Sequence, residues 1–425
     1  MGKITRLDSG QKRQIIHIDF DSFFASVEQQ FNICLRGKPI GITATNGRTC
    51  IIASSREAKV LGIKTGTRSF EAERIYPGIK LVPADFVKYY EISKKFLNIC
   101  KDYSPFVELF SIDEVFMDIT STVHLFKSKY NIVEIIKSRI KKEIGEYITV
   151  SVGISHNKLL AKLASGLKKP DGVFEIRKDE VDKIYQKVKL TDICGIGSRI
   201  GLRLNQIGIY NLLQLRDTPL SLLISEFGKS ESEFLKNISW GIDDSEIIPY
   251  TSLPSIKSIG RNYCLPKNEY DFRIVLQNIY ELCEEISIKL RRLGKKARTI
   301  GLCLGGSNNI KGQKTSGEYF DIGKDLFDVS LSIIGANKTS YIRQISVWVT
   351  NLEDKNNLPY SLFDADKRKD RLFAIIDSIN DRFGSHTIRN GFLLYTDKLT
   401  TVPNGYMADK YERTKLALDN SSDVF

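Results

Sequence analysis

The sequence predicts a multidomain α+β protein, and three observations point to this class. The 425 residues are enough for about two to four domains at roughly 100–200 residues each. Hydrophobic residues make up 42% of the chain and charged residues 27%, a balance typical of folded globular proteins. Strand and helix patterns mix in residues 1–185, helix patterns alone fill 186–248, and residues 256–350 follow the order β-α-β-β-α-β.

The first part of the chain alternates apolar runs with amphipathic segments. The β-branched run 13–20 predicts a buried strand, and Phe23, Val27 and Phe31 then have helical spacing behind a candidate cap, Ser22. Further strands are predicted at 39–45, 49–54, 106–110, 115–119, 147–155 and 173–176, and further helices at 55–62, 84–100 and 132–145.

The second part begins with the helical stretch 186–248 and continues through a proline-containing linker at 249–256. Beyond the linker, the predicted elements are strand 256–264, helix 270–293, strands 298–305 and 314–322, helix 325–335 and strand 341–350. A last amphipathic helix is predicted at 368–384.

Charge and cysteine usage narrow the functional class. The chain carries 63 Lys and Arg against 51 Asp and Glu, a net charge of +12, which favours a polyanionic partner, nucleic acid before membrane. The 7 cysteines are an odd number and form no Cys-x-x-Cys pair, so no structural zinc is expected. Without a membrane-length apolar run or a secretion signal, we expect a cytoplasmic protein with no membrane partner.

Carboxylates follow two of the predicted strands. Asp19 and Asp21 end the first strand, and Asp113 and Glu114 lie in a tight turn between two apolar strands. Neighbouring strands would hold such carboxylates close together, where they repel unless a cation lies between them. Mg²⁺ prefers oxygen ligands of this kind and keeps coordination sites for substrate phosphates. The alternative is that Asp19 and Asp21 cap the following helix and that Asp113 and Glu114 form a solvated turn.

Two further elements could contact phosphate groups. Lys169 lies in a Lys-Pro-Asp-Gly turn after a predicted helix, and Arg56 and Lys59 lie near the start of a short helix, where free N–H groups also attract anions. Gly195 and Gly197 open another helix in the manner of a helix-hairpin-helix contact with a DNA phosphate. The alternatives are solvated lysines and an ordinary turn between helices.

A cluster of basic residues lies at the end of helix 270–293 and at the start of the next strand. We expect it to follow a DNA backbone, although a solvated charged face is the alternative. The cluster consists of Arg291, Arg292, Lys295, Lys296 and Arg298.

The sequence resembles the Y-family translesion DNA polymerases, the UmuC/DinB superfamily, over residues 13–350. The resemblance rests on HIDFDSFFASVE, ASSREAKVLGIKTG, LFSIDEVFMDIT, SVGISHNKLLAKLASGLKKPDG, the ICGIG hairpin and SIKSIGRNY. Arg56 and Lys59 stand where DinB-type enzymes carry Tyr and Arg, so the chain looks closer to the UmuC-like branch.

The resemblance implies a right-hand polymerase with a palm, small fingers, a helical thumb and a little finger of β-α-β-β-α-β order. The implied boundaries are palm 1–25 and 82–186, fingers 26–81, thumb 187–248, linker 249–256, little finger 257–352 and a C-terminal extension 353–425.

The resemblance also implies a site. Asp19, Asp113 and Glu114 would be catalytic and bind two Mg²⁺ ions, with Mn²⁺ as a substitute and the carbonyl of Phe20 as a further ligand. Asp21 would be structural. Phe24 would be a steric gate that excludes a ribose 2′-hydroxyl. The implied dNTP-binding residues are Phe23, Phe24, Ser54, Arg56, Lys59 and Lys169.

The implied activity is template-directed, low-fidelity DNA synthesis across damaged template, of the kind associated with an SOS response and mutagenesis. Its partners would be primer-template DNA, dNTP, an accessory subunit and a sliding clamp, with the polymerase subunit monomeric. A clamp would dock on Leu362 and Phe363, although Pro359 stands where the docking peptide usually has Gln. The alternatives are a catalytically silent DNA-binding protein of the same fold and a palm-type nucleotide cyclase.

Overall fold

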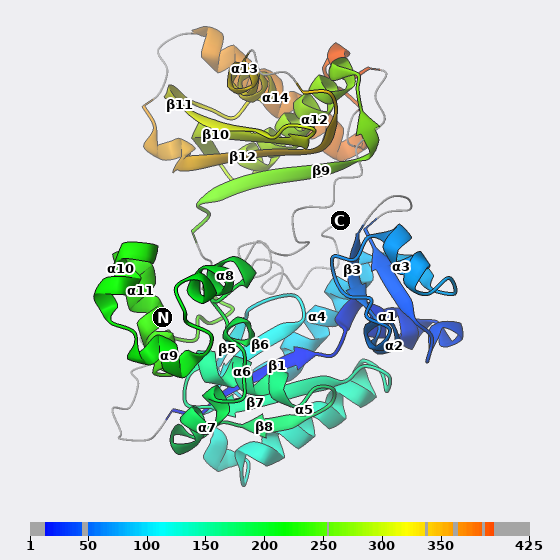
Figure 1. Cartoon of the computed structure of the whole chain (residues 1–425). Coiled ribbons are helices and arrows are strands. Elements are labelled where there is room, and N and C mark those ends of the chain that lie inside the picture. The colour runs from blue at the N-terminus through cyan, green and yellow to red at the C-terminus, as the bar shows by residue number, and fades with distance from the viewer. Residues whose placement is uncertain are drawn as a thin grey trace.

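The computed structural model describes residues 13–44, 50–252, 255–335, 339–359, 364–384 and 387–394. Three sheets, their covering helices and one all-helical segment make up this part of the chain (Figure 1). The predicted multidomain α+β class is confirmed. Among the described residues, no helix is both long enough and apolar enough to cross a membrane.

The largest sheet has five strands in the order β5-β6-β1-β7-β8. Its central strand β1 pairs antiparallel with β6 on one side and with β7 on the other. The strands are β1 (Ile15–Phe20), β5 (Phe106–Leu109), β6 (Glu114–Asp118), β7 (Val150–Ser155) and β8 (Val173–Glu175).

Side chains alternate along β1, so the two faces of the sheet differ. Ile16, Ile18 and Phe20 join one large apolar core with α4 (Phe86–Lys101) and α5 (Lys129–Glu143). Ile15, His17 and Asp19 therefore face the other side, where α6 (Lys158–Leu167) covers β1 and β7. The two carboxylates that the sequence places at strand ends, Asp19 and Glu114, are directly opposite each other in the β1–β6 register.

A glycine lets α6 approach this face closely. A Cβ built on Gly153 of β7 would lie 2.0 Å from the carbonyl oxygen of Ala161 and 2.3 Å from the amide nitrogen of Ser165, both in the backbone of α6. Only glycine fits against the helix at this distance. The close approach brings the polar side chains of α6 to the end of β1.

A second sheet has three strands in the order β3-β2-β4. Its elements and helices are α1 (Phe23–Phe31), β2 (Ile40–Thr43), β3 (Ile51–Ser54), α2 (Arg56–Val60), α3 (Ser69–Ile75) and β4 (Lys80–Pro83). Ser55 caps α2 by accepting a hydrogen bond from Ala58 N, as predicted. Ser22, expected to cap α1, has a left-handed backbone (φ 54°) and makes no capping bond; its hydroxyl instead accepts a 2.7 Å bond from Lys59 Nζ.

Residues 186–248, all of them described, contain helices and no strand, as predicted. Helix α7 (Val181–Tyr185) comes just before this stretch. The helices within it are α8 (Ser198–Gln206), α9 (Leu212–Asp217), α10 (Leu220–Phe227) and α11 (Lys229–Ser239). Residues 248–250 then return to the first sheet, where Tyr250 N donates to Val107 O at 2.8 Å and Ile248 N donates to Glu108 Oε2 at 2.8 Å.

The third sheet has the order β11-β10-β12-β9, and its elements follow the predicted sequence β-α-β-β-α-β. They are β9 (Ser258–Glu269), α12 (Phe272–Arg292), β10 (Lys295–Gly306), β11 (Ile310–Phe320), α13 (Gly323–Ile334) and β12 (Ile342–Asp354). The predicted last helix is α14 (Asp364–Phe383), which lies beside α12 and α13 in Figure 1.

Candidate active site

Backbone pairing brings the two acidic segments together at one edge of the five-stranded sheet. Asp19, the penultimate residue of β1, is directly opposite Glu114, the first residue of β6. The next amide, Phe20 N, donates a 3.0 Å hydrogen bond to Asp113 O. Because these positions are fixed by strand pairing, the three carboxylates have little freedom to move apart. The prediction that the two acidic segments adjoin is confirmed by this geometry.

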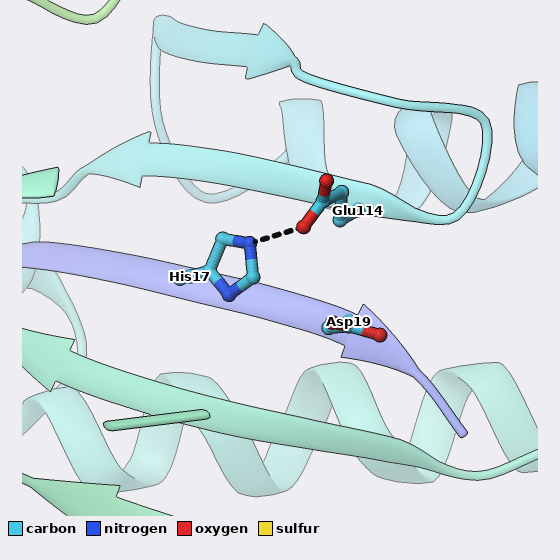
Figure 2. Close-up of side chains that lie close together, drawn as sticks. All are labelled: His17, Asp19 and Glu114. Carbon is cyan, nitrogen blue, oxygen red and sulfur yellow. Dashed lines mark hydrogen bonds and ion pairs between the residues drawn. The ribbon is translucent and has the colours of Figure 1, made fainter. Parts of the chain in front are cut away.

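A buried histidine joins the acidic edge, and sequence reasoning missed it. Ligand atoms of His17, Asp19 and Glu114 all lie within 4.8 Å of one another (Figure 2). His17 is fully buried, and burial lowers the pKa of its imidazole. The ring is therefore neutral at neutral pH, and its Nε2–H donates to Glu114 Oε2 at 2.9 Å. Its spacing of two residues from Asp19, which places both on one face of a strand, was the available signal.

Helix α6 supplies the other partners of this pair. The Ser165 hydroxyl lies 2.7 Å from Nδ1 of His17, and Lys162 Nζ forms a close ion pair with Glu114 Oε2. Burial by itself would raise the pKa of Glu114, but the hydrogen bond from His17 and the charge of Lys162 outweigh it and hold that pKa at about 2. Glu114 is thus ionised and fixed in orientation throughout the physiological range of pH.

The other two carboxylates are in a different electrostatic state. Burial raises the pKa of Asp19, partly offset by Lys169, whose Nζ lies 2.8 Å from Asp19 Oδ1. Burial likewise raises the pKa of Asp113, which accepts a hydrogen bond from the Ser111 hydroxyl. A bound cation would offset the cost of ionising both groups. Because His17 Nε2 is taken up by its hydrogen bond to Glu114, the donors left for a metal are the carboxylate oxygens of Asp19, Asp113 and Glu114, which fit a hard divalent ion.

Basic side chains surround the acidic edge. Lys169 contacts Asp19, as described above, and Lys59 is close enough for Lys169, Asp21 and Asp19 to influence its charge. Burial, reinforced by Lys169, lowers the pKa of Lys59. Arg56 Nη2 lies 3.7 Å from Asp21 Oδ2. The three cations that the sequence singled out therefore gather beside the carboxylates, in a position to bind a polyanion.

Aromatic rings pack together in α1, the helix that follows β1, and in the adjacent helix α4. Phe24 stacks on Tyr89 with 4.3 Å between ring centroids and meets Phe86 edge-on at 6.0 Å. Phe24 is partly exposed, whereas Phe23 is buried and stacks on Phe20 at 4.7 Å. The ring of Phe23 is thus part of the core, and only its backbone could contact a nucleotide. Ser54 is also buried, and its hydroxyl has no hydrogen-bond partner among the described residues.

The glycine pair lies on an exposed turn before α8. Gly195 has φ +101°, and a Cβ there would be 2.6 Å from the ring of Phe234. Gly197 occupies the N-cap position of α8, so the amides of the first turn that follow it have no helical acceptor. This geometry is compatible with phosphate binding.

The basic cluster of residues 291–298 is paired with acidic side chains of the same chain. The sequence prediction did not include these ion pairs. The shortest contacts of the cluster's first four members are Arg291–Asp377 (2.7 Å), Arg292–Asp381 (2.5 Å), Lys295–Asp354 (2.8 Å) and Lys296–Asp321 (3.6 Å). The fifth member, Arg298, donates to Ser316 O at 3.0 Å. Four of the five cations are thus partly neutralised within the chain, which weakens the expectation that this cluster follows a DNA backbone.

The predicted clamp-docking residues Leu362 and Phe363 lie outside the described residues. Pro359, just before them, is described and exposed.

Comparison with known proteins agrees with this fold. Residues 18–166 match the model of the impB/mucB/samB family, and residues 256–362 match the model of that family's C-terminal domain. A DNA polymerase IV of Pelotomaculum thermopropionicum is 34% identical over 88% of this chain and 94% of its own length. A DNA polymerase IV of Bacillus velezensis is 28% identical over 96% of this chain and 99% of its own length.

The solved structures include a Y-family DNA polymerase chimera of Dbh and Dpo4. It superimposes with a TM-score of 0.70 at 26% identity, covering 80% of this chain and 99% of the chimera. The chain belongs to the impB/mucB/samB family of Y-family translesion DNA polymerases. It is accordingly a DNA-directed DNA polymerase, while its closer likeness to the UmuC-like branch stays a prediction.

Proposed function

We propose that this protein extends a DNA primer on damaged template, with low fidelity, by nucleotidyl transfer from a dNTP to the primer 3′-hydroxyl at the acidic edge of the five-stranded sheet. The observation that carries the proposal is the meeting of Asp19, Asp113 and Glu114 at adjoining strand ends, with Arg56, Lys59 and Lys169 beside them. Buried carboxylates next to a cluster of cations suit a polyanionic substrate bound through metal ions.

Asp19, Asp113 and Glu114 would hold two divalent ions, Mg²⁺ or Mn²⁺ in its place, with the carbonyl of Phe20 as a further ligand. When bound, such ions lower the pKa of an attacking hydroxyl and stabilise charge on the phosphate oxygens. The side chains that position these ligands come from the chain itself. His17 and Lys162 orient Glu114, and Ser111 orients Asp113.

Lys169, Arg56 and Lys59 would bind the triphosphate of the incoming dNTP. Lys169 contacts Asp19 in the structure, and a triphosphate would offer it a stronger anionic partner. Positioning the phosphates and the primer terminus in line would supply most of the rate acceleration, because the protein itself contributes no covalent intermediate.

Phe24 would select deoxyribonucleotides. Its ring is held from behind by Tyr89 and edge-on by Phe86. Because these contacts fix the ring, it cannot turn aside, and it would collide with a ribose 2′-hydroxyl. The small residues Ala53 and Ser54 leave room for a distorted base pair near the fingers strand β3.

The domains of a right-hand polymerase would correspond to the observed parts. The palm would contain the five-stranded sheet, the fingers the three-stranded sheet, the thumb helices α8 to α11, and the little finger the four-stranded sheet. We propose the boundaries given above: palm 1–25 and 82–186, fingers 26–81, thumb 187–248, linker 249–256, little finger 257–352 and extension 353–425.

DNA contacts would come from the turn at Gly195 and Gly197, whose free amides would bind a backbone phosphate without reading sequence. The basic cluster of residues 291–298 would contact the DNA backbone only where its acidic partners leave positive charge exposed. Docking of a sliding clamp at Leu362 and Phe363, and dependence on an accessory subunit, complete the proposal.

Primer extension on a templated duplex with Mg²⁺ and dNTPs tests the activity. We expect extension by the wild type and none by Asp113→Ala. The control is Asp102→Ala, because the Asp102 side chain is 59% exposed at the end of α4 and pairs with Arg139 of α5. This variant should extend primers like the wild type. If the wild type binds DNA but does not extend primers, the alternative of a catalytically silent DNA-binding protein is supported. If the protein shows no salt-dependent affinity for DNA, the nucleotide cyclase is favoured.

A further inference from the structure

Asp21, the second acid of the Asp19-Phe20-Asp21 motif, is buried, and its carboxylate accepts several hydrogen bonds from the protein. The residue is 4% exposed. Its Oδ1 accepts a 2.7 Å hydrogen bond from the Ser151 hydroxyl, and its Oδ2 accepts one of 2.7 Å from the Thr149 hydroxyl. Both carboxylate oxygens are thus occupied by donors of the protein, which leaves them poorly placed to bind metal.

One of the contacts of Asp21 is with the loop that carries Lys169. Asp21 Oδ2 also accepts a 2.8 Å hydrogen bond from the backbone amide of Asp171. The side chain of the same residue is held by Lys137 of α5, whose Nζ lies 2.9 Å from Asp171 Oδ1. The loop is therefore fixed at Asp171 by two contacts, one of them with Asp21, and Lys169 lies two residues before the bound amide.

A second contact of Asp21 is with Arg56 at the start of α2. Arg56 Nη2 lies 3.7 Å from Asp21 Oδ2 and donates a close hydrogen bond to Thr149 Oγ1, which in turn donates to Asp21. The guanidinium is thus oriented both by charge and by a relay of hydrogen bonds. Arg56 belongs to the three-stranded part of the chain and Lys169 to the five-stranded part, so Asp21 links cations from both.

We propose that Asp21 is a positioning residue that sets Arg56 and Lys169 at a fixed separation for the triphosphate of the incoming dNTP. The inference rests on the proposed function of the acidic edge. Asp21 acts through the two cations and does not touch substrate. Removing its charge should therefore weaken dNTP binding while leaving the chemical step at Asp19, Asp113 and Glu114 almost intact.

Asp21→Asn tests the proposal, because it keeps the volume but replaces one acceptor oxygen with a donor. Bonds to charged groups are the stronger hydrogen bonds, so we expect the KM for dNTP in primer extension to rise about tenfold and kcat to change less than about threefold. Asp118→Asn is the matched control: its Oδ1 accepts from Thr120 N at 3.0 Å at the opposite end of β6, and both constants should stay at wild-type values.

A double-mutant cycle with Arg56→Ala identifies the route. If Asp21 acts through Arg56, Asp21→Asn should raise the KM by a smaller factor in the Arg56→Ala background than in the wild type. Full multiplication of the two effects, or a loss of kcat at unchanged KM, would overturn the proposal. Thr149→Val, which removes only the relay hydroxyl, should raise the KM about threefold and keeps the test open if Asp21→Asn does not fold.

The outcomes separate this inference from the function beneath it. A wild type that does not extend primers would refute the proposed function itself. A wild type that extends primers while Arg56→Ala and Asp21→Asn both leave the KM for dNTP unchanged would refute the inference alone.

Discussion

Replacing Glu114 by Gln should destabilise the five-stranded sheet in the metal-free protein. The side chain of Glu114 is 12% exposed, and its partners are His17 and Lys162. A carboxyl whose pKa falls from 4.5 to about 2 on folding stabilises the ionised folded state by about 3 kcal/mol. Lys162 is 26% exposed and can turn to water in the variant, so we expect a loss of about 2 kcal/mol.

The sign of the pH dependence follows from the same pKa. Because folding lowers the pKa of Glu114, its stabilisation is complete above pH 4.5 and is lost as the pH falls towards about 2. The difference between Glu114→Gln and the wild type should therefore be largest at neutral pH and should shrink at about pH 3.

Amide hydrogen exchange in β1 and β6, measured with chelator present, reports the stability of this sheet without requiring the whole chain to unfold in one step. Glu134→Gln, at an exposed position of α5, is the control and should exchange like the wild type. Equal protection of wild type and Glu114→Gln at pH 7, or a difference that is no smaller at pH 3, would refute the reasoning.

Three further predictions concern the sugar gate, the DNA contact and the metal ligands. Phe24→Ala should raise ribonucleotide incorporation in single-nucleotide extension, since the braced ring is gone, and unchanged sugar discrimination would count against the gate. Gly195→Ala should weaken affinity for primer-template DNA at least several-fold, because a Cβ at φ +101° would meet the ring of Phe234 at 2.6 Å; a filter-binding titration that matches the wild type would contradict it. Burial raises the pKa values of Asp19 and Asp113, so protonation competes with metal and Mn²⁺ affinity should fall as the pH is lowered. An Mn²⁺ titration followed by electron paramagnetic resonance that shows the same affinity at pH 5.5 and 7.5 would argue against these ligands.

The acidic edge could be predicted from the sequence because strand ends have few possible positions. An apolar run that ends in Asp19 and a tight acidic turn before another apolar run are local signals, and sheet pairing is enough to bring them together. The resemblance to a known family then supplied proposed roles that local signals do not carry, such as the sugar gate at Phe24.

Other features depended on contacts between distant parts of the chain. His17 reads as one more residue of a buried strand, and only the packing of α6 against Gly153 shows that Ser165 and Lys162 meet it and Glu114. The partial neutralisation of the basic cluster was not predicted, for the same reason. The carboxylates that pair with Arg291 and Arg292 lie on α14, 86 and 89 residues further along the chain.

Burial also decided cases in which residue type was ambiguous. Phe23 and Phe24 are adjacent aromatic residues, and the sequence does not distinguish the one that stacks in the core on Phe20 from the one that stays half-buried and stacks on Tyr89. Ser22 has the residue type of a helix cap, yet its left-handed backbone turns the hydroxyl to Lys59.

Running-start primer extension past a single abasic site tests the central claim most directly. The purified chain, alone with Mg²⁺ and dNTPs, should insert a nucleotide opposite the lesion and extend beyond it, while Asp113→Ala should do neither. The same reaction on undamaged template shows that the enzyme is active. Efficient copying of undamaged template with complete arrest at the abasic site, unrelieved by added sliding clamp, would contradict the account of this protein as a translesion polymerase.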